Sequence, residues 1–169
     1  MRNTSYAVAI GSNRRHGRHG GPARVVAAAV AALDCKGLTV ERLSRIRATP
    51  ALGPAGRGFA NAAVLLSTAL EPPALIARLK ALERGFGRRR GRRWGPRVLD
   101  LDIILWSQGA WAAAGLVVPH PDFRRRRFVL DPLSEIVPGW RDPLSGRTVR
   151  QLRHRLAAPR PVDPGRARS

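Results

Sequence analysis

Short stretches of alternating or largely apolar residues predict the β-strands of this chain. They span residues 6–10, 38–47, 59–68 and 98–106, with a further short candidate at residues 117–118. Apolar residues at helical spacing predict two helices, one starting at Pro22 and one near Pro72, because proline suits the first helical turn. Gly85 and Gly87 end the second helix.

The order strand, helix, strand, strand, helix, strand predicts an α+β fold, the ferredoxin-like plait. Such a plait is an antiparallel sheet with helices packed on one face, and we expect the other face to be available for a ligand. Residues 128–136 predict a further short element and residues 148–156 a last helix. We therefore expect one folded domain over residues 1–156 and a disordered tail, rich in Pro and Arg, over residues 157–169.

Length and composition agree with a single globular domain. The chain has 169 residues, of which 44% are hydrophobic. No apolar run reaches the roughly 20 residues that span a bilayer, and the first residues do not resemble a signal peptide. The single cysteine, Cys35, excludes an internal disulfide. These features predict a cytoplasmic protein without a membrane partner, and we expect a monomer.

The formal net charge of +20 indicates an anionic partner. Nearly all basic residues are arginine, and alanine is also frequent. A GC-rich coding sequence produces the same bias, so the scattered arginines alone decide nothing. The cluster over residues 88–97 is denser than that bias readily explains.

Asp100 and Asp102 are the most informative candidates for chemistry. Both lie in the strand predicted over residues 98–106, and alternation places them on one face while Leu99, Leu101 and Ile103 lie on the other. Carboxylates about 6.5–7 Å apart along a strand repel each other unless a cation lies between them. Mg²⁺ prefers one or two carboxylates together with phosphate oxygens and water. Two solvated acids on an exposed strand face remain the alternative.

The arginine cluster immediately precedes this acidic pair. Guanidinium groups bind phosphate oxygens in a bidentate way, and metal-bound carboxylates bind the same oxygens from another side. The two features together therefore favour polyphosphate chemistry. Taken alone, the cluster is equally well explained as a solvated basic loop.

Three further residues outside these motifs are candidates for binding. Phe59 and Asn61 share a strand face, where a ring to stack on and an amide to form hydrogen bonds suit a flat heterocycle. His120, between two prolines, is placed to touch a phosphate. The alternative interpretations are that Phe59 belongs to the hydrophobic core and that His120 is a loop residue without a function.

These residues resemble the 6-hydroxymethyl-7,8-dihydropterin pyrophosphokinase family. The similar stretches occur in the family's order at residues 9–13, 49–54, 59–64, 93–97, 99–103, 118–121 and 126–133. The resemblance implies an ATP-dependent diphosphotransferase of folate biosynthesis. The expected partners are ATP and the reduced pterin, with neither nucleic acid nor a membrane among them.

The resemblance also implies residue roles. Asp100 and Asp102 would bind two Mg²⁺ ions that bridge ATP and the pterin hydroxyl. The residues implied to bind the pterin, with Phe59 and Phe128 on either side of its ring, are Thr49, Pro50, Leu52, Phe59, Asn61, Trp94 and Phe128. Those implied to bind ATP are Glu83, Arg93, Arg97, His120 and Arg126. The arginines implied to assist the transfer are Arg88 and Arg90.

The chain departs from the family pattern in the segment before Trp94. This segment is one residue shorter than the pattern, which blurs the register of Arg88 and Arg90. The acidic residue that usually follows residues 11–13 is replaced by Arg14-Arg15-His16. Neither departure removes a metal ligand.

Two other classes of function remain open from the sequence. The charge is compatible with an RNA-binding plait, although acidic residues on its central strand would repel phosphate. Paired acids are also compatible with a metal-dependent nuclease, which leaves Phe59 and Asn61 unexplained.

Overall fold

The computed structural model describes residues 2–49, 58–87 and 98–157. In chain order the elements are β1 (Thr4–Ser12), α1 (Pro22–Leu33), β2 (Thr39–Leu43), β3 (Arg47–Thr49), β4 (Phe59–Thr68), α2 (Pro72–Gly85), β5 (Asp100–Trp106), β6 (Trp111–Ala113), β7 (Leu116–Val118), the short 3₁₀ helix η1 (Phe123–Arg125), α3 (Arg127–Ile136) and α4 (Val149–Ala157). Every strand and helix expected from the pattern is present, and the stretch expected as one strand over residues 38–47 is divided between β2 and β3.

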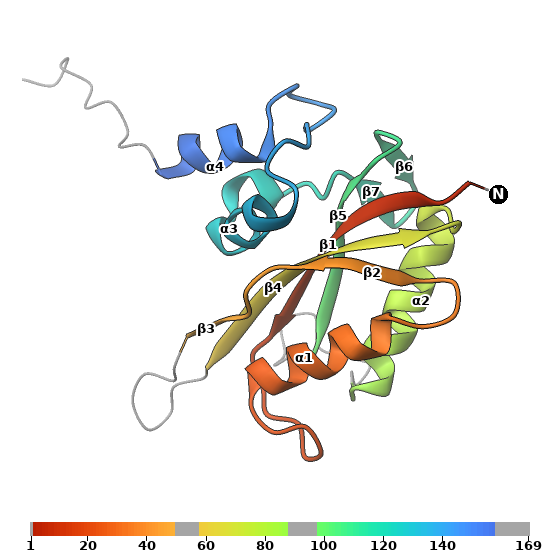
Figure 1. Ribbon diagram of the computed structural model, residues 1–169, viewed down its shortest axis with the longest axis vertical. Helices are drawn as coiled ribbons and strands as arrows, with labels where there is room; N and C mark the ends of the chain where they lie inside the picture. Colours follow the sequence, from red (N-terminus) through yellow and green to blue (C-terminus); the bar gives the residue numbers. More distant parts are fainter. Residues whose placement is uncertain (1, 50–57, 88–97, 158–169) are drawn as a thin grey trace, which may run out of the picture.

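The main sheet is antiparallel and has the order β2-β4-β1-β5, with β3 also paired to β4 (Figure 1). This is the strand order of the split βαβ plait. The expected α+β class is therefore confirmed. β6 and β7 form a separate two-stranded hairpin after β5, of which the sequence indicated only the second strand.

One face of the sheet is covered by α1 and α2. Their apolar stripes, which include Val26 of α1 and Leu75 of α2, pack on alternate residues of the central strands. Tyr6 of β1, Val64 of β4 and Leu101 of β5 are all fully buried in this layer. The layer fixes which residues of each strand point away from it, toward the opposite face.

The sequence predicted that the helices pack on one face of the sheet. The structure differs, because helices lie on both faces. α3 and α4 pack on part of the opposite face, against the residues of β1, β4 and β5 that point away from α1 and α2, and Figure 1 shows the sheet between the two helix pairs. The apolar side of α3, with Leu130 and Leu133 fully buried, drives this packing. The remainder of that face carries the polar residues considered below.

None of the helices in the described parts of the chain combines the length and the apolar composition needed to cross a bilayer.

A buried ion pair anchors the segment between α3 and α4. The carboxylate of Asp142 has no exposed surface and accepts two 2.6 Å hydrogen bonds from the guanidinium of Arg124. It also accepts hydrogen bonds from the Ser145 hydroxyl and the Leu144 N–H. Burial raises the pKa of Asp142, but these hydrogen bonds outweigh burial and lower the pKa to about 2.

We expect the Asp142→Asn substitution to lower the free energy of unfolding by roughly 3 kcal/mol near neutral pH, because it leaves Arg124 without its buried partner. An aspartate has an unfolded-state pKa of about 4, so the stabilisation is present above that pH and is lost as the pH falls toward 2. Urea unfolding at several pH values should show the difference between the wild type and Asp142→Asn shrinking over this range.

The matched control is Asp122→Asn, since the Arg126–Asp122 pair is exposed on both sides. Exposed pairs contribute about 1 kcal/mol or less. Equal and pH-independent effects of the two substitutions would contradict the role given to Asp142.

Candidate functional site

One row of residues crosses the sheet on the face opposite α1 and α2. In the β-ladder register, Asp100 of β5 lies opposite Gly11 of β1, Gly11 lies opposite Asn61 of β4, and Asn61 lies opposite Arg47 of β3. Directly paired residues project to the same face, and adjacent strands are about 4.8 Å apart. The fold therefore brings a carboxylate and an amide, about 40 residues apart in sequence, to one line with only a glycine between them.

A second row lies parallel to the first, toward the middle of the sheet. It consists of Asp102 of β5, Ala9 of β1 and Ala63 of β4. The small residues Ala9 and Gly11 are only partly buried and form a shallow floor between the acidic residues at one edge and Asn61 at the other. Ala63, by contrast, is fully buried in the cluster that α3 and α4 cover. A large side chain at Ala9 or Gly11 would fill the space above the floor.

Gly11 is the floor residue that sequence reasoning did not assign to the site. A Cβ atom at this position would lie 3.3 Å from Oδ1 of Asn61, which is tighter than an ordinary van der Waals contact. The Asn61 side chain thus extends over β1 toward Asp100. A run of small residues alternating along β1, Ala7, Ala9 and Gly11, was the signal in the sequence that this strand face is shallow.

Asp100 and Asp102 are both partly buried and project from the same strand face, as alternation predicted. Burial raises the pKa of the Asp102 carboxyl, and the neighbouring charge of Asp100 raises it further. His120 and Lys80 act in the opposite direction, and their effect is smaller. The pair is therefore a site where added positive charge is favourable.

Glu83, at the end of α2, lies behind the acidic pair. Its side chain is fully buried, and its Oε1 accepts a 2.8 Å hydrogen bond from the N–H of Leu101, the residue between the two aspartates. Lys80, one turn earlier on α2, donates to the same oxygen at 3.0 Å. Lys80 was not among the residues selected from the sequence.

His120 is held next to β5 by the backbone. Its N–H donates to the carbonyl of Ile104 at 3.1 Å, and its Nδ1 accepts a 3.2 Å hydrogen bond from the N–H of Asp122. Because its ring is near enough to influence the pKa of Asp102, His120 lies at the same edge of the sheet as the carboxylates.

Two aromatic rings are exposed in spite of the cost of leaving them in water. Phe59, at the start of β4, is 47% exposed and Phe128, in the first turn of α3, is 54% exposed. Arg126 lies next to the second ring, with its guanidinium carbon 6.0 Å from the Phe128 centroid, and pairs with Asp122 at 3.1 Å. Singly exposed apolar side chains are common on protein surfaces, so the exposure of the two rings is compatible with a binding surface and does not by itself indicate one.

Thr49 extends this surface, because it pairs with Phe59 across the β3–β4 ladder. The segment leading into β3 is tied to α3 through Glu135. The Glu135 carboxylate accepts hydrogen bonds from the Arg45 N–H at 2.8 Å and from the Arg47 guanidinium at 2.6 Å. Both contacts lower its pKa, the Arg45 bond most strongly. α3 and β3 are thereby fixed relative to each other.

The other residues selected from the sequence lie outside the described residues. They are Pro50, Leu52, Arg88, Arg90, Arg93, Trp94 and Arg97. Their assignments therefore stay predictions.

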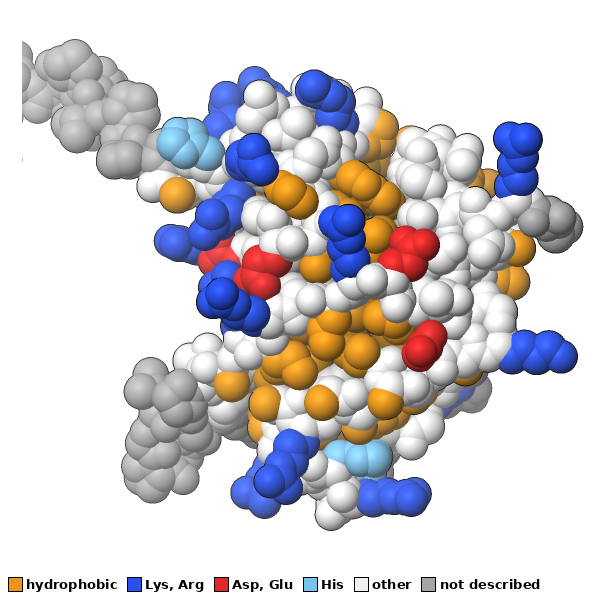
Figure 2. Space-filling view, in the orientation of Figure 1, with side chains coloured by type: hydrophobic (Ala, Val, Ile, Leu, Met, Phe, Trp, Pro, Cys, Tyr) orange, Lys and Arg blue, Asp and Glu red, His pale blue; other side chains and the backbone are white. Residues whose placement is uncertain are grey.

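The surface charge follows the composition. On the face that Figure 2 shows, Lys and Arg side chains outnumber Asp and Glu side chains, and most of them lie toward the margin of the face.

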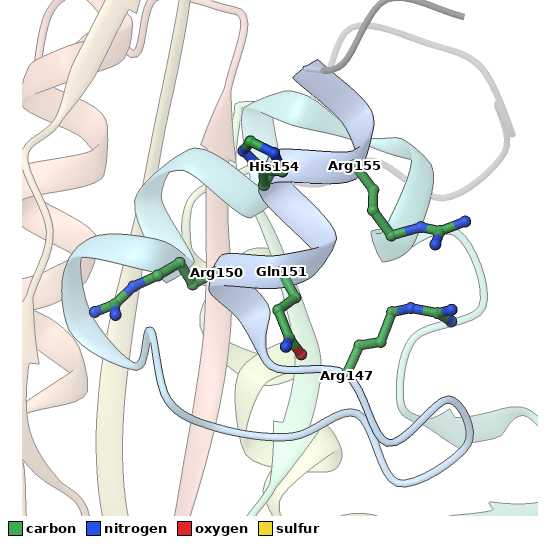
Figure 3. A pocket seen from close by; sticks show the side chains of 5 residues that line it. All are labelled: Arg147, Arg150, Gln151, His154 and Arg155. Atoms are coloured by element: carbon green, nitrogen blue, oxygen red, sulfur yellow. The ribbon is translucent and has the colours of Figure 1, made fainter. Parts of the chain in front are cut away.

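An open groove of about 460 Å³ lies on α4 and the segment before it. Its lining residues are Arg147, Arg150, Gln151, His154 and Arg155. In Figure 3, Arg147 and Arg155 extend in the same direction and Arg150 extends in another. None of the groove residues belongs to the two rows on the sheet.

Comparison with known proteins gives a consistent result. Residues 7–138 match the family model described as 7,8-dihydro-6-hydroxymethylpterin-pyrophosphokinase. A protein from Synechocystis sp., named 2-amino-4-hydroxy-6-hydroxymethyldihydropteridine pyrophosphokinase, is 44% identical over 131 residues, which cover 76% of this chain and 67% of that protein. A Bacillus subtilis protein of the same name is 41% identical over 100 residues, covering 59% of this chain and 60% of the relative.

Solved structures with the same fold include a Plasmodium falciparum HPPK-DHPS protein. Its TM-score is 0.69 at 10% sequence identity, and the match covers 91% of this chain and 41% of that one. At this identity the likeness supports the fold alone, and it agrees with the α+β class.

We expect Gly11→Ala to displace the Asn61 side chain, since the new Cβ would lie 3.3 Å from Oδ1. The side-chain amide resonances of Asn61 should shift in ¹H–¹⁵N NMR spectra, while the free energy of unfolding changes by about 1 kcal/mol or less. Gly139→Ala is the control, because a Cβ there meets nothing within 4 Å. Asn61 resonances that stay unmoved in Gly11→Ala would show that the two residues are not in contact.

Proposed function

The chain belongs to the 7,8-dihydro-6-hydroxymethylpterin-pyrophosphokinase family, and on this basis we propose that it transfers a diphosphoryl group from ATP to the hydroxymethyl group of 6-hydroxymethyl-7,8-dihydropterin. The products are AMP and the pterin diphosphate. The observation that carries the proposal is the pair of register rows, which places Asp100 and Asp102 at one edge of a shallow floor and Asn61 across it.

The carboxylate pair fits Mg²⁺ by the chemistry of its donors. Among the residues that the structure describes, no group of three or more His, Cys, Asp or Glu could enclose a metal ion. Two carboxylates alone leave most positions around a cation for phosphate oxygens and water, and this is the arrangement Mg²⁺ prefers. Burial and then the charge of Asp100 raise the pKa of Asp102, so a cation beside the pair would stabilise the ionised carboxylates.

In this proposal Asp100 and Asp102 would hold two Mg²⁺ ions. When bound, they supply positive charge that offsets the charge of the phosphates. The protein contributes by holding Asp100 and Asp102 in fixed positions on β5, whose opposite face is buried.

The pterin lies on the floor beside β3 and β4. Phe59 and Phe128 provide exposed rings for the two faces of the heterocycle, and Asn61 provides a donor and an acceptor for its polar edge. Glu135 ties α3, which carries Phe128, to the segment that leads into β3. Thr49, Pro50, Leu52 and Trp94 complete this pocket in the proposal.

The nucleotide lies on the other side of the acidic pair. His120 is held at the edge of β5 near Asp102. Arg126 pairs with the exposed carboxylate of Asp122 in the structure. In the proposal, its guanidinium leaves Asp122 and binds a phosphate group, which carries more negative charge. Arg93 and Arg97 assist in binding ATP, and Arg88 and Arg90 assist the transfer.

The transfer itself needs little covalent chemistry from the protein. The pterin hydroxyl oxygen forms a bond to the β-phosphorus, the bond from that phosphorus to the oxygen bridging to the α-phosphorus breaks, and AMP leaves with the electron pair. The hydroxyl proton is released to solvent. Positioning and charge neutralisation therefore account for most of the catalysis.

The RNA-binding and nuclease alternatives have less support. Asp100 and Asp102 lie on the open face of the sheet, where they would repel phosphate in the absence of a cation. The expectation that their strand is central is wrong, because β5 is the edge strand in the order β2-β4-β1-β5. A nuclease does not account for the two exposed rings or for Asn61.

We expect Asp102→Asn to lower the rate of pterin-dependent AMP formation by at least about 100-fold, because it removes one carboxylate from the cation site. Circular dichroism and thermal unfolding should show an intact fold. Glu41→Gln, on the exposed strand β2, is the control and should stay within about twofold of the wild type. Near-wild-type activity of Asp102→Asn with Mg²⁺ would refute the metal assignment.

We expect Phe59→Ala and Phe128→Ala to weaken pterin binding by about 5- to 100-fold each, which corresponds to about 1–3 kcal/mol of stacking. Calorimetry in the presence of Mg²⁺ and a saturating non-hydrolysable ATP analogue measures the effect. The affinity for the analogue should change by less than about twofold.

Leu144→Ala is the matched control, because Leu144 is 69% exposed and lies in the turn before α4. Pterin affinities that do not change in the two Phe variants, or that change equally in Leu144→Ala, would contradict the stacking assignment.

A further inference from the structure

Glu83 is a carboxylate buried behind the catalytic strand and not on its open face. Its side chain has no exposed surface. The resemblance implies that Glu83 binds ATP, and this stays a prediction. Two of its contacts are with the protein itself: Oε1 accepts hydrogen bonds from the N–H of Leu101 at 2.8 Å and from the ammonium of Lys80 at 3.0 Å.

The Leu101 N–H belongs to the outer edge of β5. The strand is last in the order β2-β4-β1-β5, so within the described residues β1 is its only ladder partner. N–H groups of successive residues point to opposite edges of a strand. Asp100 and Asp102 thus direct their N–H groups toward β1, and Leu101 directs its N–H away from β1, to Glu83.

A buried N–H without a partner destabilises a fold by about 1–3 kcal/mol, so this edge requires an acceptor. A glutamine would satisfy the requirement without a charge. Burying a carboxylate is far more costly than burying an amide, and the 3.0 Å ion pair with Lys80 is one of the interactions that offset this cost. The negative charge lies beside the peptide that joins Asp100 and Asp102, so it acts on any cation that the pair binds.

We propose that Glu83 is a positioning residue for the reaction: its carboxylate fixes the peptide between Asp100 and Asp102, and its charge strengthens the hold of that pair on divalent cations. This inference rests on the proposed function of the pair. In this role Glu83 acts through the N–H of Leu101. The two contributions are separable, because Gln retains an acceptor oxygen of similar reach and lacks the charge.

The first test does not depend on activity. Amide hydrogen exchange measured by NMR should show the Leu101 N–H protected in the wild type and in Glu83→Gln, and exchanging at least about tenfold faster in Glu83→Ala. Glu71→Ala, on the exposed residue that precedes α2, is the control and should leave this exchange unchanged. Equal protection of Leu101 in all four proteins would overturn the proposal.

The second test separates geometry from charge by kinetics. We expect Glu83→Ala to lower kcat by about 10- to 100-fold at saturating Mg²⁺, because small displacements of catalytic groups have effects of this size. Glu83→Gln should restore most of kcat but raise the Mg²⁺ concentration for half-maximal rate by about three- to tenfold. Loss of kcat in both variants with an unchanged Mg²⁺ requirement would contradict the role of the charge.

The two proposals fail in distinguishable ways. A wild-type protein that forms no AMP with ATP and pterin contradicts the proposed function. Leu101 exchange and Mn²⁺ binding, followed by electron paramagnetic resonance, still test Glu83 in that case. Mn²⁺ affinity that is identical in the wild type and Glu83→Gln would overturn the contribution of its charge.

Discussion

The placement of the two aspartates depends on the packing of the other face of β5. Leu99 and Leu101 are buried between the sheet and the helices α1 and α2, and this burial sets the register of β5 against β1. A slip by one residue would move Asp100 and Asp102 into the apolar layer and bring leucines to the open face. Such an exchange costs several kcal/mol for each buried charge, so the hydrophobic layer holds the metal-binding side chains in place.

The same register explains why distant parts of the chain meet. Gly11 pairs with both Asp100 and Asn61, so a residue of β1 without a side chain separates the candidate metal ligands from the candidate pterin ligand. α3 and α4 cover only part of this face. Because Glu135 ties α3 to the segment leading into β3, the exposed ring of Phe128 is presented from an element fixed to the sheet.

Much of this was predictable from the sequence because local patterns determine it. Alternation along residues 98–106 was sufficient to place Asp100 and Asp102 on one face, and the bounds of β4 and the start of α2 followed from Phe59, Thr68 and Pro72. The membership of the family was confirmed by the match over residues 7–138.

Long-range contacts were beyond the reach of those patterns. Nothing in the residues around Glu83 indicates that its carboxylate accepts the Leu101 N–H, since the contact depends on how α2 crosses the edge of β5. The covering of the second face by α3 and the contact between Gly11 and Asn61 depend likewise on strand pairing. The sequence indicated a short element over residues 128–136, but neither its helical form nor the sheet face on which it packs.

The central claim is that Asp100 and Asp102 bind divalent cations together with the triphosphate of ATP. Anomalous diffraction from crystals grown with Mn²⁺, a non-hydrolysable ATP analogue and the pterin tests this most directly. The account predicts two manganese peaks, both bound by oxygens of this carboxylate pair and of the phosphates. Manganese bound to the nucleotide but out of reach of both aspartates would contradict it.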